Sequence, residues 1–255
     1  MQCPVCGHLL QFPAEDFNCA VCEHRLQTHE IHKENKALLQ EVKEMHMAQT
    51  TLTRALFYNN EQLILAFIRQ IDIRDRYTGH HSKRVAWLAT HIGKMLELKH
   101  TQLIELHRAG NVHDIGKVYV PDTILNEPGK LKEDEMSIMK KHPIKGVELL
   151  QHLDLFIHTI PVVRSHHENY DGTGYPDGLK GENIHYWARI VAIADSIDAM
   201  RSARPYRPGL DKKTIINELK INAGIQFDPV MINIIFKKDE HLNFINNLGE
   251  DLIRE

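Results

Sequence analysis

Histidines next to carboxylates are the residues of this sequence best suited to chemistry. The segment His113-Asp114-Ile115-Gly116-Lys117 closes a stretch of apolar residues with helical spacing. An adjacent His and Asp at a helix end can both face one metal cluster, with the aspartate bridging two ions. A glycine just past them lets the chain turn away. The pair alone is a weak signal, because a capping aspartate beside a core histidine gives the same pattern.

Four further features favour a metal site. His81 stands at the start of a predicted helix, His142 precedes a proline, and His166-His167-Glu168 precedes a glycine-rich segment. Asp195 lies in an otherwise apolar helix. A carboxylate buried there needs a cation or a full set of hydrogen bonds, and a metal ion would supply the cation.

The cysteines suggest a second, separate metal site. They form two CxxC pairs separated by 12 residues: Cys3, Cys6, Cys19 and Cys22. Each pair makes a tight turn that points two thiolates at one centre, and two such turns complete a tetrahedral zinc site. We predict one structural zinc in a zinc-ribbon-like module, residues 1–26, where the metal supplies the folding energy. Unpaired thiols in a disordered tail are the alternative.

The next segment is expected to form one long helix, because residues 27–75 contain neither proline nor glycine. Its apolar residues follow a heptad pattern, with polar residues at the remaining seam positions. The apolar members are Leu38, Val42, Met45, Leu52, Leu56 and Leu63, and the polar ones are Asn35, Gln49 and Asn59. This pattern is typical of a coiled coil and predicts a parallel homodimer through residues 30–66. The alternative is an amphipathic helix packed on its own domain.

Helical spacing continues through the rest of the chain, interrupted by prolines and glycines. We therefore predict an all-α protein with a helical bundle domain. The expected divisions are residues 1–26, a zinc-ribbon-like module; 27–62, a helical or coiled-coil linker; 63–238, the bundle domain; and 239–255, a C-terminal tail.

Composition excludes several classes of function. The formal net charge of −3 gives no support to nucleic-acid binding. No apolar run approaches the ~18 residues of a membrane span, and the first residues lack the pattern of a signal peptide. A cytoplasmic protein without membrane contact is the expectation.

Taken together, the motifs resemble the HD-GYP subgroup of the HD-superfamily phosphohydrolases. The resemblance rests on six segments in the expected order: residues 113–117, 140–143, 166–178, 188–200, 204–207 and 224–229. It implies a hydrolase that converts cyclic di-GMP to linear pGpG or GMP by attack of a metal-bridging hydroxide.

The resemblance also implies a set of metal ligands. His81, His113, Asp114 and Asp195 would hold one divalent metal. Asp114 would bridge to a second, held by His142, His166 and His167. This ligand set suits Fe or Mn. His80 is the nearest rival of His81, but the ligand is expected directly before Ser82. Some members carry an acidic residue, associated with a third metal, where this chain has Tyr77, so two metals are expected.

The resemblance implies substrate contacts as well. Lys117 would act beside Asp114 in catalysis and contact phosphate, although a solvated surface lysine is the alternative. Tyr175 would stack on or hydrogen-bond a guanine, and a plain surface loop with an anchoring tyrosine rivals that reading. Asp198 would accept hydrogen bonds from the paired N–H groups of a guanine edge. Arg204 and Arg207 would bind the second phosphate or stack on a base.

Two other functions stay open at this stage. One is a non-catalytic sensor or scaffold that binds the dinucleotide or a diguanylate cyclase. The other is an HD phosphohydrolase for a different nucleotide, such as 3',3'-cyclic GMP-AMP or (p)ppGpp.

Overall fold

Helices are the regular secondary structure of the residues that the structure describes, and loops connect them. This computed structural model describes Gly7 and residues 20–75, 80–202 and 209–237. The elements in chain order are α1 (Ala20–Arg74), α2 (His81–Met95), α3 (His100–Val112), η1 (Ile115–Tyr119), α4 (Asp122–Leu125), α5 (Glu133–Met139), α6 (His142–Leu150), η2 (Asp154–Thr159), α7 (Ile160–Ser165), η3 (Gly181–Asn183), α8 (Tyr186–Arg201), α9 (Lys212–Ile221) and α10 (Pro229–Phe236). Within these ranges there is no strand, only an isolated bridge between Ala223 and Phe227. The all-α prediction is confirmed.

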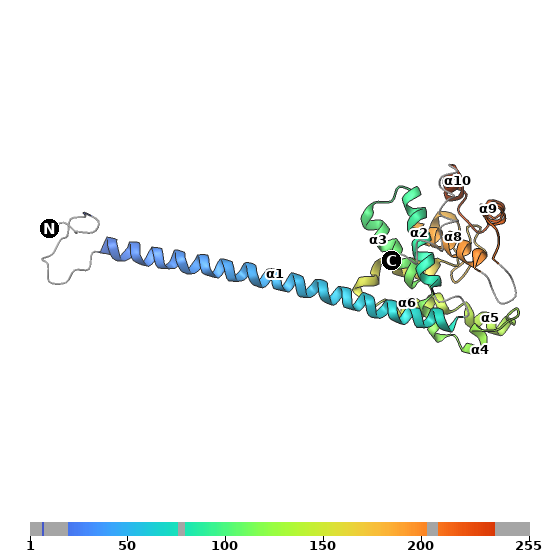
Figure 1. Cartoon of the computed structure of the whole chain (residues 1–255), viewed down its shortest axis with the longest axis horizontal. Coiled ribbons are helices and arrows are strands. Elements are labelled where there is room, and N and C mark those ends of the chain that lie inside the picture. The colour runs from blue at the N-terminus through green and yellow to red at the C-terminus, as the bar shows by residue number, and fades with distance from the viewer. Residues whose placement is uncertain (1–6, 8–19, 76–79, 203–208, 238–255) are drawn as a thin grey trace. The chain divides into compact units, whose positions relative to one another are not determined.

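Helix α1 is one continuous element of 55 residues (Figure 1). It begins at Ala20 rather than at residue 27, because residues 20–27 also contain no helix breaker. Cys22 therefore lies in its first turn, and Cys3, Cys6 and Cys19 lie outside the described residues. The chain divides into two compact units, Met1–Asn60 and Glu61–Glu255. Among the described side chains of the first unit, none is buried.

The main core of the second unit lies where α2, α3 and α8 pack together (Figure 1). Helix α2 contributes Val85, Leu88 and Ile92, which recur at helical spacing on one face and are fully buried. Ile193 and Ile197 of α8 are equally buried in the same cluster. This apolar contact fixes the helices whose ends carry the histidines.

The last turns of α1 belong to the second unit and are tied to it by both apolar and polar contacts. Ile68 and Ile71 are buried in a second core cluster. Asp72 is buried and accepts hydrogen bonds from the backbone N–H (3.1 Å) and the hydroxyl (2.7 Å) of Ser82. It thereby caps the first turn of α2, whose own N-cap residue provides no side-chain cap. The end of α1 thus fixes the start of α2.

Gly116 is required for a close approach between η1 and α6. A Cβ atom at this position would lie 1.9 Å from the carbonyl oxygen of His142 and 2.5 Å from the backbone nitrogen of Gly146. These are backbone atoms, so the clash is not relieved by a side-chain movement. The glycine is needed for backbone contact with α6, and not only for the turn that the sequence predicted.

None of the described helices combines the length and the apolarity that crossing a membrane requires. The cytoplasmic location stays a prediction.

We predict that Gly116→Ala destabilises the protein by about 1–3 kcal/mol, because the added methyl group overpacks the contact with α6. Gly129→Ala is the matched control, since its Cβ would meet only the Glu127 carboxylate oxygen, at 3.6 Å. Denaturant unfolding of both variants measures the free energies. Equal stability of the two variants would contradict the packing argument.

Candidate metal centre

The carboxylate of Asp114, between α3 and η1, lies at the centre of a cluster of imidazoles. Its Oδ2 atom is 3.7 Å from Nε2 of His81 and 3.3 Å from Nε2 of His113. Its Oδ1 atom is 3.1 Å from Nε2 of His142 and 3.6 Å from Nε2 of His166. The two oxygens therefore face two different sets of histidines, as expected of a carboxylate that bridges two ions.

Each histidine candidate lies at the end of a helix or directly beyond it. His81 is the first residue of α2 and His142 the first of α6, whereas His113 and His166 directly follow α3 and α7. His167 comes next in the chain, and its ring centroid is 5.0 Å from that of His142. The fold thus brings ends of four helices to one point.

Three of these rings are oriented by the same local hydrogen bond. The Nδ1 atom of each lies within hydrogen-bond distance of the carbonyl three residues earlier. The pairs are His113 with Gly110 at 2.8 Å, His142 with Met139 at 2.8 Å and His166 with Val163 at 2.9 Å. A carbonyl only accepts, so Nδ1 carries the proton and donates it. In its neutral form, each of these rings leaves an Nε2 lone pair that faces Asp114.

This arrangement fits cations. The Nε2 atoms of His142 and His166 are 3.3 Å apart, so in the neutral rings two lone pairs would face each other. Nε2 of His113 and Oδ1 of Asp114 are buried without a hydrogen-bond partner among the described residues. Buried acceptors that face acceptors are costly unless positive charge lies between them. A mixed set of imidazoles and a carboxylate suits divalent transition metals.

Ligand atoms gather in two groups that share Asp114. One group is Asp114, His142, His166 and His167, and the other is His81, His113 and Asp114. Within each group, the ligand atoms lie within 4.8 Å of one another. Asp195 of α8 is outside these groups, but its Oδ1 is 3.5 Å from Nε2 of His81. His80, the rival of His81, is exposed and belongs to neither group.

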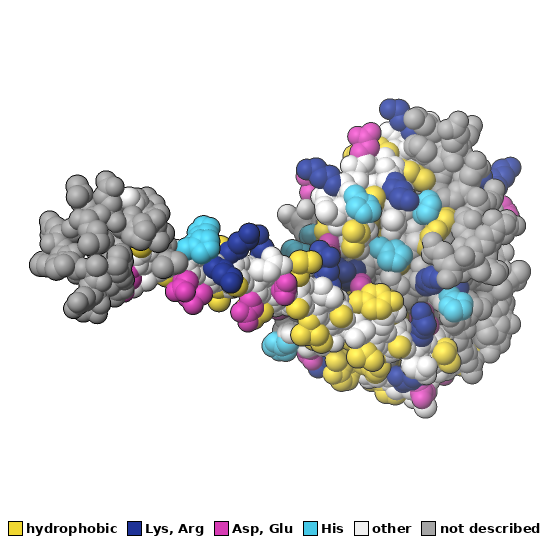
Figure 2. Space-filling view, turned by 60° about the vertical axis from the view of Figure 1, so that its left-hand side comes forward, with side chains coloured by type: hydrophobic (Ala, Val, Ile, Leu, Met, Phe, Trp, Pro, Cys, Tyr) yellow, Lys and Arg dark blue, Asp and Glu magenta, His cyan; other side chains and the backbone are white. Residues whose placement is uncertain are grey.

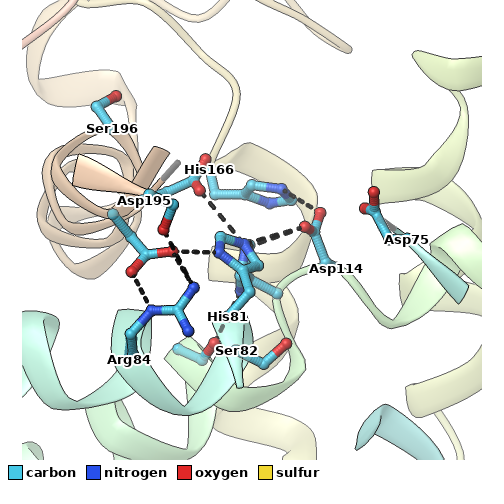
Figure 3. A network of polar contacts seen from close by, with 12 residues as sticks. Asp75, His81, Ser82, Arg84, Asp114, His166, Asp195 and Ser196 are labelled. Carbon is cyan, nitrogen blue, oxygen red and sulfur yellow. Dashed lines mark hydrogen bonds and ion pairs between the residues drawn. The ribbon is translucent and has the colours of Figure 1, made fainter. Parts of the chain in front are cut away.

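His81 has a carboxylate partner where three other rings have a carbonyl. Its Nδ1 atom is 2.8 Å from Oδ2 of Asp198, and Arg84 from the same helix donates to both oxygens of Asp198. Figure 3 shows His81 pointing toward both Asp195 and Asp114. Burial lowers the pKa of His81, but hydrogen bonds to Asp114 and Asp198 and the charge of Asp195 outweigh it and raise the pKa to about 10.

This geometry corrects the prediction for Asp198. Its side chain is 1% exposed, and its oxygens are engaged by His81 and Arg84, so they are not available to a guanine edge. A carboxylate on the far nitrogen of a metal-binding histidine fixes the tautomer and the orientation of the ring. Asp198 therefore supports His81 and does not face a ligand.

Lys117 connects Asp114 to a second carboxylate. Its ammonium is 2.7 Å from Oδ2 of Asp114 and 2.8 Å from Oδ2 of Asp75, the residue that follows α1. Burial lowers the pKa of Lys117, but the charges of Asp114 and Asp75 raise it well above its usual value. Burial likewise raises the pKa of Asp114, and the charges of Lys117 and His113 outweigh that effect and lower it. This corner of the site is thus a buried ion pair.

The remaining predicted residues fall into two groups. The Tyr175 ring stacks on the His167 ring, with centroids 4.8 Å apart. Tyr77, Arg204 and Arg207 lie outside the described residues.

Sequence reasoning missed Asp75, Arg84 and Glu168 as parts of this region. Arg84 lies three residues after His81, a spacing that places both on one helix face, and this signal was available. Glu168 directly follows His167 in the chain. The pairing of Asp75 with Lys117 joins residues 42 positions apart, and no local pattern indicates it.

Comparison with known proteins places this site in a family. A family model described as an HD domain matches residues 66–231. The chain therefore belongs to the HD domain family. The matched segment contains all the histidines of the site described above.

The chain is also similar to curated phosphodiesterases. It is 40% identical over 172 residues to the cyclic di-GMP phosphodiesterase response regulator RpfG of Xanthomonas campestris pv. campestris, covering 66% of this chain and 45% of that protein. It is 33% identical over 180 residues to 3'3'-cGAMP-specific phosphodiesterase 2 of Vibrio cholerae, covering 70% of this chain and 34% of that protein. It is 29% identical over 234 residues to the cyclic di-GMP phosphodiesterase of Thermotoga maritima, covering 89% and 64%. The chain thus spans between 34% and 64% of the length of these relatives.

Two solved structures share the fold. One is a cyclic GMP-AMP specific phosphodiesterase of V. cholerae, V-cGAP3, with a TM-score of 0.59 and 18% identity over 76% of this chain and 52% of that chain. The other is Bd1817, an HDG"Y"P protein from Bdellovibrio bacteriovorus, with a TM-score of 0.52 and 23% identity over 71% and 54%. At these identities the likeness concerns the fold.

We predict that Asp198→Asn lowers the affinity of the site for Mn²⁺ by about 10–100-fold, because His81 loses its charged partner. Isothermal titration with Mn²⁺ measures the effect. Asp211→Asn is the matched control, since Asp211 caps α9 at the surface. An unchanged affinity in Asp198→Asn would show that this carboxylate does not support His81.

Proposed function

We propose that the chain is an HD-GYP phosphodiesterase that hydrolyses cyclic di-GMP to linear pGpG or GMP. The observation that carries this proposal is the sharing of Asp114 between two groups of imidazoles, one on each carboxylate oxygen. A pair of ions bridged in this way suits the displacement at phosphorus that a phosphodiesterase performs. The relatives named cyclic di-GMP phosphodiesterases support the same reaction.

In this proposal, His81, His113, Asp114 and Asp195 hold one ion, and Asp114, His142, His166 and His167 hold the other. Fe or Mn is the proposed metal, since imidazole-rich sites with a carboxylate suit these ions. When bound, the two ions would supply Lewis acidity toward the phosphodiester and its attacking water.

The residues around the ions have supporting tasks. Asp198 keeps the proton on Nδ1 of His81, so that Nε2 is left for an ion. Lys117 keeps its charge at this depth and holds Oδ2 of Asp114. Because of this position, we propose that Lys117 also faces the phosphate of the substrate. Asp114 and Lys117 would then form the catalytic pair.

The substrate is proposed to contact Lys117, Tyr175, Arg204 and Arg207. A second candidate substrate is 3',3'-cyclic GMP-AMP, because relatives with 33% and 37% identity carry names specific for it. A complete set of imidazoles facing Asp114 favours an enzyme over a non-catalytic sensor, since a scaffold for a diguanylate cyclase does not need them.

The N-terminal zinc site and the four-part division of the chain belong to the same proposal. Cys22 is half-buried in the first turn of α1, and its CxxC spacing from Cys19 in the sequence supports the proposed site. The zinc-ribbon-like module comprises residues 1–26, the linker 27–62, the catalytic domain 63–238 and the tail 239–255.

We further propose that the chain forms a parallel homodimer through residues 30–66. The apolar heptad positions of α1 are all exposed, from 49% at Val42 to 69% at Leu63. On the visible surface of α1, apolar side chains lie among charged ones (Figure 2). A long helix gains most of its stability from packing of its apolar face. A second copy of α1 would cover this seam in the manner of a coiled coil.

The catalytic proposal predicts turnover of a cyclic dinucleotide by the full chain loaded with Mn²⁺, or with Fe²⁺ under anaerobic conditions. Asp114→Asn should lower kcat at least about a thousandfold, a barrier increase of about 4 kcal/mol. Chromatography would follow cyclic di-GMP, 3',3'-cyclic GMP-AMP and pppGpp in parallel. Asp134→Asn, an exposed change in α5, is the control. No turnover of either cyclic dinucleotide by the loaded wild-type chain would refute the proposal.

The dimer proposal predicts that Leu52→Lys raises the dissociation constant of the dimer at least tenfold, about 1.4 kcal/mol, because it places a charge in the seam. Gln40→Lys adds the same charge on the opposite face of α1 and should leave the constant unchanged. Analytical ultracentrifugation measures both variants. A monomeric wild-type chain would contradict the dimer proposal.

A further inference from the structure

The His167 ring is oriented differently from the other imidazoles of the metal centre. The other four rings each have a hydrogen-bond partner at Nδ1, either a backbone carbonyl or Asp198. Among the described residues, no hydrogen bond reaches the ring of His167. Its ring instead stacks on that of Tyr175, with a centroid distance of 4.8 Å and an interplanar angle of 24°. The rings of His166 (4.2 Å, 45°) and His142 (5.0 Å, 85°) also lie close to it, but both are ligand candidates themselves and neither is stacked. Among these ring contacts, the one with Tyr175 therefore orients His167 from outside the set of ligands.

Tyr175 is held by a segment that folds back onto the backbone of His167. The N–H of Tyr175 donates to the carbonyl of His167 at 3.1 Å. A Cβ atom on Gly174 would lie 2.6 Å from the same carbonyl and 2.5 Å from Cα of Glu168. Only glycine permits so close an approach of two backbones. The chain directly before Tyr175 is thus packed against the chain that carries His167.

Glu168 fixes the segment on the other side of Tyr175. This side chain is 2% exposed and accepts three backbone hydrogen bonds. The N–H groups of Asp177 (2.7 Å) and Gly178 (3.1 Å) donate to Oε1, and that of Leu179 (3.0 Å) donates to Oε2. Charge-assisted bonds of this kind are about twice as strong as neutral ones. Residues 174–179 are therefore fastened at both ends to His167 and Glu168.

Lys140 adds to the contacts of the tyrosine ring. Its ammonium lies 5.4 Å from the centroid of the Tyr175 ring, within the range of a cation–π interaction. The ring of Tyr175 is thus placed by contacts from two parts of the chain before any substrate is present.

We infer that Tyr175 is a positioning residue that orients the imidazole of His167 by ring stacking, and that Glu168 in turn positions Tyr175. This inference rests on the proposed metal centre and deepens it. It gives the tyrosine a task in ion binding that does not depend on guanine. Without the stacked Tyr175 ring, the side chain of His167 would lose conformational freedom only when the ion binds. The entropic cost of this ordering would lower the affinity for the ion.

Two substitutions at Tyr175 separate stacking from other contributions. Tyr175→Phe keeps the ring and removes the hydroxyl, whereas Tyr175→Leu keeps much of the apolar volume and removes the ring. Binding of Mn²⁺ to the full chain would be followed by electron paramagnetic resonance of the free ion, with no nucleotide present. We expect wild type and Tyr175→Phe to bind two Mn²⁺ ions with the same affinities. Tyr175→Leu should bind one of the two at least about tenfold more weakly, as is usual when the support of a metal ligand is lost.

Glu168→Gln tests the second part of the inference. An amide presents one acceptor oxygen to three N–H donors, so the segment loosens and the same Mn²⁺ ion should bind more weakly. Asp177→Asn is the matched control on the same segment. It removes the exposed ion pair with Arg164 but leaves the backbone bonds to Glu168, so both affinities should stay unchanged.

The outcomes separate this inference from the proposed function. Two Mn²⁺ ions bound as tightly in Tyr175→Leu as in wild type would overturn the inference while the metal centre stands. A wild-type chain that binds no Mn²⁺ would overturn the metal centre, and the inference with it. If Tyr175→Leu does not fold, a weakened ion in Glu168→Gln but not in Asp177→Asn supports the inference, and equal affinities in the two variants overturn it.

Discussion

The contact between the carboxylate of Asp114 and the nitrogens that surround it governs the rest of the domain. At His113, His142 and His166, Nδ1 donates to a backbone carbonyl and Nε2 faces oxygens that only accept, so a neutral ring directs a lone pair at them. Such a set is unfavourable in a protein interior unless positive charge joins it. Lys117 supplies one such charge, 2.7 Å from Oδ2. Divalent ions would supply the others, and this requirement explains why so many buried polar groups share one point.

The apolar core maintains this arrangement by fixing where helices end. Packing of α2 against α3 and α8 places His81 and His113 on one side of Asp114. The contact of Gly116 with the backbone of α6 brings His142 to the other side. Asp72 at the end of α1 caps the first turn of α2, directly beside His81. The ligand positions therefore depend on these three contacts and not on the histidines alone.

The sequence predicted the all-helical fold and the residues that meet at Asp114, because short motifs with unusual residue types carried that information. The predicted start of α1 was late, because the CxxC spacing assigned residues 20–26 to the zinc-ribbon-like module. Sequence reasoning assigned Asp198 to a guanine because a carboxylate one turn after Asp195 looks available. Its actual partners, His81 and Arg84, are more than a hundred positions away. The stacking of Tyr175 on His167 was likewise missed, because a ring contact leaves no trace in residue spacing.

The carbonyl partners of His113, His142 and His166 have a consequence for how such a centre is inherited. Each partner lies three residues before its histidine, so every ring is aimed by its own short piece of backbone. When α3 or α7 shifts, His113 or His166 moves together with the carbonyl that aims it, whereas Met139, the partner of His142, ends α5 just before α6. Substitutions in the surrounding core can then change the spacing between the rings without changing which nitrogen each of these rings presents. His81 and His167 lack this protection, because Asp198 and Tyr175 must be retained alongside them.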